Sequence, residues 1–320
     1  MVDNEPFLAK IASFMITATK RYSASVGRDT SKARTYANLF GYFKRNRWIA
    51  RRDCNQVFGG ALKTATTHLK KPVSDMRVLE IGHGQHATIS LLFHSSGAKT
   101  TGIDMDYVRF GFSPKTYWRI FKLNGLERAL TTLGRNILFD PGYYNEVQKC
   151  FGKTLQKRDL NLRRMNAADM DFADNTFDFV FSFAVFEHIA DVESTAKEIA
   201  RVLTSDGVAS LSIDLFPSLS GGHNLEWAFP DDAQSKRVPA WDHLRDNLYP
   251  THVYLNKLTA TDYLEIFKRH FDVVECAYIL EGRSLLTAEL EQELTKKGYT
   301  RHDLLARSLR VVLHSKKQGR

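Results

Sequence analysis

A short apolar run, a glycine-containing turn and an apolar helix follow one another at residues 77–93, and this succession constrains the fold most. The apolar residues of 77–81 predict a buried strand, Gly82 and Gly84 lie in the turn, and residues 90–93 belong to the predicted helix. In α/β folds, such a unit brings backbone N–H groups and a helix N-terminus close to a ligand. A side chain at either glycine would block that approach, so we expect Gly82 and Gly84 to bind a cofactor.

The unusual residue of this unit is Glu80, an acid at the end of an otherwise apolar strand. The glycine spacing alone also fits a dinucleotide site, as in NAD(P) oxidoreductases, but it is a weak signal. A buried carboxylate requires a cation or hydrogen-bond donors. A pyrophosphate would repel Glu80, whereas the ammonium group of S-adenosylmethionine (SAM) would pair with it. The alternative is that Glu80 caps loop amides. His86, in the same turn, either narrows this end of the site or projects away from it.

A second predicted strand, at residues 101–104, ends in Asp104. Asp104 lies 22 residues after Gly82, close to the spacing of about 20 residues that is typical of an acid bound to ribose hydroxyls. We therefore expect Asp104, together with the adjacent Met105, to contact the nucleoside part of a cofactor.

Further motifs follow in an order that resembles the class I SAM-dependent methyltransferases, with a core like that of methyltransferase type 11. The resemblance covers about residues 76–215 and rests on five motifs, at Glu80–Gly84, Thr101–Asp104, Asn166–Ser182, Val185–Ile189 and Arg201–Gly207. It implies an α/β fold with a Rossmann-like seven-stranded sheet and SAM as the cofactor. It also implies that Asn166 and Ala167 line the adenine and that Ser182 lies at the cofactor. Relatives commonly have Asp in place of Asn166, but an amide oxygen also accepts a hydrogen bond.

His188, next to Glu187 after the fourth predicted strand, is the first candidate for a catalytic base. An alcohol is a poor nucleophile while protonated, and an imidazole can remove its proton during methyl transfer. The alternative is that both residues only cap a turn. His223 and His243 are further base candidates. In ubiquinone-pathway O-methyltransferases a Glu, Glu, His trio can hold a metal here. Because Ala184 stands where the first of these acids would be, we expect no metal.

The chain divides into a helical N-terminal extension, residues 1–75, and a methyltransferase domain, residues 76–316. Two inserts, at about 107–162 and 216–258, are expected to cap the active site, the first of them mostly helical. The extension carries arginines around Trp48. These residues form either a lid over an acidic or sugar substrate or the solvent-exposed face of a helical layer packed on the core.

The second insert is rich in Trp, His, Asp and Arg, a composition that suits a polyhydroxy ligand, with aromatic faces stacked on a sugar ring. It also resembles bacterial methyltransferases associated with glycans and glycolipids. The alternative is a long loop held in place by buried tryptophans.

Charge and cysteine content limit the remaining alternatives. Lys and Arg exceed Asp and Glu by 45 to 36, which favours either an anionic partner or a solvated face. No RNA-binding signature accompanies this charge, so we do not expect nucleic acid as a partner. The sequence has no apolar run long enough for a membrane span and no secretion signal, and its three cysteines form no metal or disulfide pattern, so we expect a cytoplasmic protein.

The predicted function is SAM-dependent O-methylation of a hydroxyl on a polar small molecule, sugar or glycan. A nucleic-acid methyltransferase and a non-catalytic SAM-binding regulator remain as alternatives. The sequence does not predict the oligomeric state.

Overall fold

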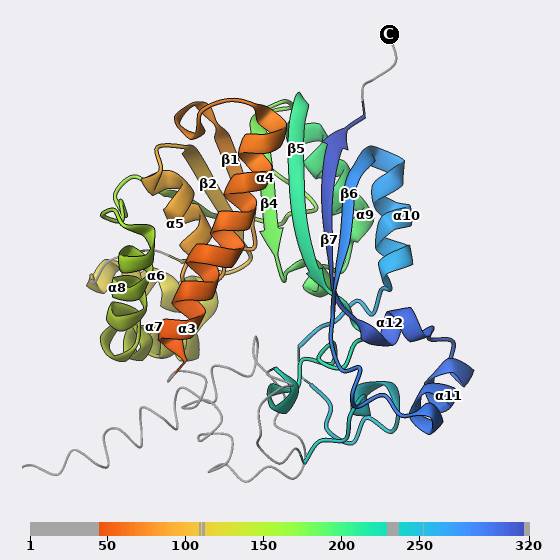
Figure 1. Ribbon diagram of the computed structural model, residues 1–320. Coiled ribbons are helices and arrows are strands. Elements are labelled where there is room, and N and C mark those ends of the chain that lie inside the picture. Colours follow the sequence, from red (N-terminus) through yellow and green to blue (C-terminus); the bar gives the residue numbers. More distant parts are fainter. Residues whose placement is uncertain (1–44, 109, 111–112, 229–236, 252, 317–320) are drawn as a thin grey trace, which may run out of the picture.

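Seven strands form one mixed sheet in the order β3-β2-β1-β4-β5-β7-β6 (Figure 1). The computed structural model describes residues 45–108, 110, 113–228, 237–251 and 253–316. β7 pairs antiparallel with both β5 and β6, and the other neighbouring strands pair parallel. This arrangement confirms the predicted Rossmann-like seven-stranded sheet, and the antiparallel pair of β6 and β7 forms one edge of it. The strands are β1 (Arg77–Ile81), β2 (Lys99–Asp104), β3 (Asn161–Arg164), β4 (Phe177–Phe183), β5 (Leu203–Asp214), β6 (Phe271–Leu280) and β7 (Ala306–Ser315).

Helices surround the sheet on both faces. The α-helices of the described residues are α3 (Asn46–Arg51), α4 (Gly59–Leu69), α5 (Thr88–Ser95), α6 (Pro114–Asn124), α7 (Leu126–Leu138), α8 (Asp140–Phe151), α9 (Val192–Val202), α10 (Ala260–His270), α11 (Ala288–Lys296) and α12 (Arg301–Leu305). A π-helical segment, η1 (Arg52–Phe58), joins α3 to α4. Short 3-10 turns include η3 (Phe186–His188) and η5 (Asp242–Leu244). No helix of the described residues is both long and apolar enough to cross a membrane.

Each central strand is buried on both faces because its alternate side chains enter two different apolar layers. In β4, Phe179 and Phe181 pack beneath α4 and α5. Val180, between them, faces the opposite layer, which α9 and α10 cover. A largely apolar strand whose successive side chains point to opposite faces is typical of a sheet covered by helices on both sides. The carboxyl ends of β1, β2, β3 and β4 therefore meet at one edge of a rigid sheet (Figure 1).

The described part of the N-terminal extension forms a helical layer on this sheet. Residues of α3, η1 and α4 belong to the apolar cluster that also contains Phe179. The guanidinium of Arg52 lies 5.7 Å from the ring of Trp48 and 5.8 Å from that of Phe183. These contacts favour the packed-layer interpretation of the basic residues. The predicted helical pattern of residues 1–44 lies outside the described residues.

The first insert is mostly helical, as predicted, because α6, α7 and α8 separate β2 from β3. Its last helix is held against the extension: the hydroxyl of the buried Tyr143 donates to Asp53 at 2.6 Å, and Arg51 donates to Glu146 at 2.7 Å. Whether this insert caps the active site stays a prediction.

The second insert packs with α11 and α12 around a third apolar cluster, in the lower part of Figure 1. Trp241 is fully buried in this cluster and Trp227 is 5% exposed. Asp242 accepts from the backbone N–H groups of Leu248 and Tyr249 at 3.1 and 2.9 Å. Buried rings cannot stack on a sugar, so for these two tryptophans the structure supports the alternative of a loop held by its own core.

Candidate active site

The turn after β1 presents two glycines with different constraints. Gly82 has φ +74°, and a Cβ there would lie 2.3 Å from the side chain of Val185, in the turn after β4. Gly84 has φ +59°, and no described atom lies within 4 Å of the Cβ position. The expectation of a close ligand approach therefore fits Gly84, where the backbone faces open space. At Gly82 the constraint comes from Val185.

Glu80 lies on the same face of β1 as Val78, toward α5. It is buried, and its Oε2 accepts from the backbone N–H of Ser90 at 2.7 Å and from the Ser90 hydroxyl at 2.5 Å. Burial raises the pKa of Glu80, and the bonds from Ser90 oppose that shift. Glu80 thus caps an amide, although in α5 rather than in the turn. Its second carboxylate oxygen takes part in neither bond, and a contact with the ammonium of SAM stays a prediction.

Asp104 connects the end of β2 to the glycine turn. Its Oδ2 accepts from the N–H of Gly84 at 2.9 Å, and its Oδ1 accepts from the N–H of Asp106 at 2.9 Å. A carboxylate therefore stands beside the open backbone of Gly84, as a ribose-binding acid would. Met105 follows and is 54% exposed.

The other predicted cofactor residues lie at the neighbouring strand ends. Asn166 is exposed after β3, with Ala167 beside it, and its Oδ1 accepts from the N–H of Ala168 at 3.1 Å. Ser182 is fully buried in β4, and its hydroxyl donates to the carbonyl of Ile81 at 3.0 Å. Its side chain therefore joins two strands, which leaves Asn166 and Ala167 as the accessible candidates.

These residues fit SAM. An open glycine backbone, an adjacent carboxylate and an exposed amide lie at the ends of three adjoining strands. His86 does not obstruct them: its Nε2 lies 3.0 Å from Asp140 Oδ1 and its ring stacks on Tyr143 at 4.2 Å. Of the two alternatives for His86, the structure shows the one in which it projects away, toward α8.

The second half of the site is the turn after β4. Phe186 is fully buried in the core and fixes the 3-10 turn η3, which carries Glu187 and His188. Asn256, at the end of the second insert, donates to the carbonyls of Phe186 and Ile189 at 2.7 and 3.0 Å. Its own N–H donates to the carbonyl of Glu187 at 2.9 Å. Asn256 thus fixes the turn through three hydrogen bonds.

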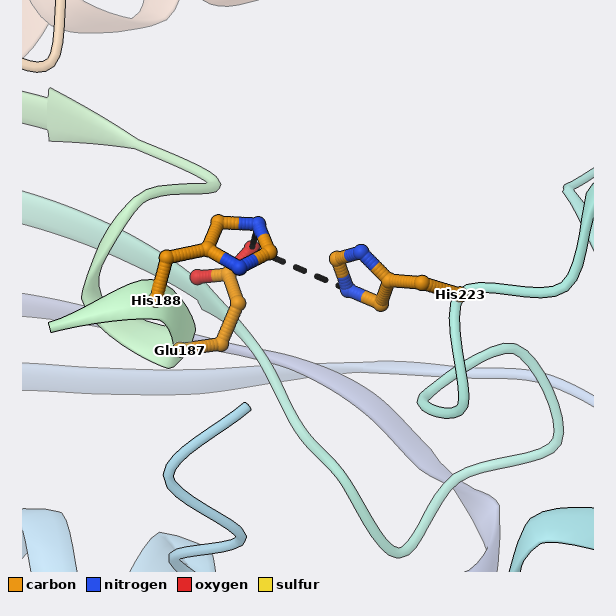
Figure 2. Close-up of side chains that lie close together, drawn as sticks. All are labelled: Glu187, His188 and His223. Carbon is orange, nitrogen blue, oxygen red and sulfur yellow. Dashed lines mark ion pairs between the residues drawn. The ribbon is translucent and has the colours of Figure 1, made fainter. Parts of the chain in front are cut away.

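Glu187, His188 and His223 converge, and we call them the Glu-His-His cluster (Figure 2). The Oε1 of Glu187 lies 3.9 Å from His188 Nε2 and 4.0 Å from His223 Nε2. The two rings are perpendicular, with centroids 4.9 Å apart. Figure 2 shows that His223 reaches the carboxylate from the second insert, opposite η3. Among the described residues, neither carboxylate oxygen of Glu187 accepts a hydrogen bond of normal geometry.

Burial dominates the electrostatics of this cluster. It raises the pKa of Glu187 well above the ordinary value, and the nearby negative charge of Asp214 raises it further. Burial lowers the pKa of His188, against a hydrogen bond to the carbonyl of Tyr254. Burial and the neighbouring His188 lower the pKa of His223 to about 4. At neutral pH both imidazoles are therefore uncharged and hold a free lone pair.

His243, the third predicted base, lies outside the cluster. Its Nε2 is 2.9 Å from the carbonyl of Phe216, and burial lowers its pKa to about 4. Its ring packs on Gly222, where a Cβ would lie 2.5 Å from the imidazole. The structure therefore brings together two of the three predicted histidines. Asn256 and Tyr254, which position the cluster, were part of the insert pattern, but nothing in the sequence identified their targets.

Comparisons with known proteins found similar structures, one relative and one family model. An S-adenosylmethionine-dependent methyltransferase structure from Mesorhizobium loti is similar at 16% identity and a TM-score of 0.42, covering 78% of this chain and 95% of that one. A Pyrococcus horikoshii protein structure is similar at 15% identity and a TM-score of 0.43, covering 84% and 91%. An O-methyltransferase of Aspergillus sclerotiorum, resE, is 26% identical over 165 residues, covering 45% of this chain. The chain spans 62% of that relative's length.

A family model described as a methyltransferase domain matches residues 139–211, from the start of α8 into β5. The strand order and this match together define a class I methyltransferase fold. The match identifies a methyltransferase domain within this chain, and SAM is the cofactor that such a domain implies.

Proposed function

We propose that this protein transfers a methyl group from SAM to a hydroxyl of a polar small molecule, sugar or glycan. The observation that carries the proposal is the contact between Gly82 and Val185, because a Cβ on Gly82 would enter the Val185 side chain. This contact supports the proposal because the glycine turn that we expect to bind SAM lies directly beside the turn that carries Glu187 and His188. Two reactants held at adjoining strand ends gain rate through proximity and orientation.

The residues of the chain divide this work. Gly84 and Asp104 would hold the nucleoside side of the cofactor, and Asn166 with Ala167 would line its adenine. When bound, SAM supplies a methyl group attached to a positively charged sulfur. After transfer, the sulfur keeps the electron pair of the broken carbon–sulfur bond and becomes a neutral thioether. His188 Nε2 would remove the proton of the acceptor hydroxyl as that oxygen becomes the nucleophile. A neutral imidazole is the form required for this role.

Support for the acceptor class comes from the cluster and from one likeness. The Glu-His-His cluster offers polar atoms suited to hydroxyl groups, and the Aspergillus relative is described as an O-methyltransferase. The buried Trp227 and Trp241 give no support to a sugar. The absence of a membrane-crossing helix among the described residues is compatible with the cytoplasmic location that we propose.

The test is a methyl-transfer assay with labelled SAM and fractionated glycans, lipids, small metabolites and RNA. We expect label in a hydroxyl-containing acceptor and acceptor-dependent release of S-adenosylhomocysteine. Binding of SAM without release for any acceptor, unchanged by loss of His188, His223 and His243, would instead favour a SAM-binding regulator. Transfer to RNA with strongly salt-dependent binding would favour a nucleic-acid enzyme.

A further inference from the structure

We propose that the Glu-His-His cluster binds one divalent transition-metal ion. The three ligand atoms lie within 4.8 Å of one another and come from two separate segments, η3 and the second insert. No run of consecutive residues indicates this set, because His223 lies 35 residues after His188 in the chain.

The first argument is that no well-formed hydrogen bond satisfies a buried carboxylate. Glu187 is 2% exposed, and among the described residues neither of its oxygens accepts a hydrogen bond of normal geometry. Leaving such a group without a partner is unfavourable by several kcal/mol. Two imidazole nitrogens, His188 Nε2 and His223 Nε2, lie 3.9 and 4.0 Å from Glu187 Oε1. A cation between the three atoms would satisfy them all at once.

The second argument is the orientation of His188. Its Nδ1 lies 2.9 Å from the carbonyl oxygen of Tyr254, which can only accept. The Nδ1 atom therefore carries the proton, and Nε2 turns its lone pair toward Glu187. Metal-binding histidines almost always donate the second N–H to a carbonyl or carboxylate in this way. The contact thus prepares His188 as a ligand before any ion arrives.

Donor chemistry selects the ion class. Two imidazoles and one carboxylate suit Zn²⁺ and other first-row transition ions, whereas Mg²⁺ and Ca²⁺ prefer oxygen ligands. With metal–ligand bonds of about 2.0–2.1 Å, two ligands at a tetrahedral angle are about 3.4 Å apart. The two carboxylate–imidazole spacings, 3.9 and 4.0 Å, are slightly longer, so side-chain rotations would close the set. Three protein ligands leave a position open, as in catalytic sites.

This inference extends the proposed function, since the open position would take the acceptor hydroxyl. A bound divalent ion lowers the pKa of a coordinated oxygen, and that of a coordinated water falls to near neutrality. The hydroxyl proton would pass to water, and the coordinated oxygen would form the bond to the methyl carbon while the carbon–sulfur electron pair returns to sulfur. In the metal-loaded protein, His188 acts as a ligand, and it acts as a base only without the ion.

The experiment measures binding without activity. The chain is stripped with a chelator and titrated with Zn²⁺ by calorimetry, and with Co²⁺ by absorption spectroscopy. We expect one equivalent to bind, with Kd raised at least about tenfold in Glu187→Gln, His188→Ala and His223→Ala. Mg²⁺ should not compete. The circular dichroism spectrum and the melting temperature of each metal-free variant show whether it is folded.

The matched control is a second imidazole pair at the opposite end of the sheet. His68 contacts His314 at 3.2 Å and Glu275 at 2.9 Å, and His314 pairs in register with Val208 near the start of the core of β5. His68→Ala should leave Zn²⁺ binding unchanged. No binding to the wild-type chain, or loss of binding in His68→Ala alone, overturns the metal site. Tight binding without methyl transfer to any acceptor counts against the proposed function instead and leaves the metal site standing.

Discussion

The Nδ1 atom of His188 lies 2.9 Å from the carbonyl oxygen of Tyr254, and this contact determines which nitrogen of the imidazole can react. A carbonyl oxygen only accepts, so the proton resides on Nδ1 and the lone pair on Nε2. That lone pair faces Glu187 and His223 (Figure 2). Because Tyr254 belongs to the second insert, the insert orients the reactive atom of a turn that β4 carries.

Removal of this imidazole should slow catalysis without weakening cofactor binding. We expect His188→Ala to lower kcat by at least about 10²-fold, the loss typical of a missing proton acceptor. The Kd for S-adenosylhomocysteine should change little, since His188 is not among the predicted cofactor residues. The matched control is His302→Ala, which removes a histidine of α12 that packs against Tyr278. Normal turnover in His188→Ala would exclude it from the mechanism.

The pH dependence of the metal-free enzyme should reflect the buried position of the same residue. Burial lowers the pKa of His188 below its ordinary value of 6.5. The imidazole therefore stays neutral, and able to accept a proton, to a lower pH than a free histidine. We expect the acid limb of kcat/KM, measured in chelator, to have an apparent pKa below 6.5 and to vanish in His188→Ala. An acid limb above 6.5 would contradict this assignment.

Gly84 offers a direct test of the cofactor site. Gly84→Ala places a methyl group in the open space beside Asp104, so we expect the Kd for S-adenosylhomocysteine to rise at least about tenfold by calorimetry. The substitution also strains the backbone, because an L-residue at positive φ costs about 1 kcal/mol.

Gly298→Ala separates these two effects. Gly298 has φ +96°, and no described atom lies within 4 Å of its Cβ position, but it lies between α11 and α12. It should lose similar stability and bind the cofactor normally. Equal affinities in the two variants would remove the turn from the cofactor site.

Asn256 should act as a positioning residue. Its side chain holds the carbonyls of Phe186 and Ile189 and accepts from the hydroxyl of Tyr263 at 2.9 Å. Asn256→Ala should release the turn that carries Glu187 and lower kcat about tenfold, because small displacements of reacting groups are costly. Cofactor affinity should remain within about twofold, which calorimetry would check. The exposed Asn247→Ala is the control, and a loss of cofactor binding in Asn256→Ala would indicate a general structural role.

The parts of the fold that repeat a local pattern were predictable. The apolar run of β1, the glycine turn and the acid of Asp104 are each contained in a few consecutive residues, and the strand order follows from the family resemblance. The proximity of His223 to Glu187 could not be predicted, because it depends on how a long insert folds back toward β4. The burial of Trp241 could not be predicted either. A tryptophan that packs in the core of a loop and one that stacks on a sugar have the same sequence pattern.

Asp178, near the start of β4, accepts hydrogen bonds from the start of β1. Its Oδ2 accepts from the backbone N–H of Arg77 at 2.8 Å and its Oδ1 from the Arg77 guanidinium at 2.9 Å. Lys71 Nζ lies 2.8 Å from Oδ2. The Asp178 side chain is 7% exposed. Its pairing with Arg77 links the beginnings of β1 and β4, at the end of the sheet opposite the candidate active site, and stabilises the register of the two strands.

Asp178 should therefore give the protein an acid-sensitive stability. Burial alone would raise the pKa of Asp178, but the hydrogen bonds from Arg77 and Lys71 outweigh it and set the pKa at about 2. The unfolded chain has an Asp pKa of about 3.9, so the folded state binds fewer protons between these values. The contribution is fully present above about pH 4 and is lost as the pH falls toward 2.

We expect Asp178→Asn to lower the free energy of unfolding at pH 7 by about 2 kcal/mol, measured by urea denaturation. The difference from the wild type should shrink as the pH is lowered below 4, because the protonated wild-type residue then resembles the amide. Asp171→Asn removes a carboxylate that is 89% exposed and pairs with Arg163, and it should leave stability unchanged. A constant difference between pH 7 and pH 3 would mean that Asp178 stabilises the fold by packing rather than by charge.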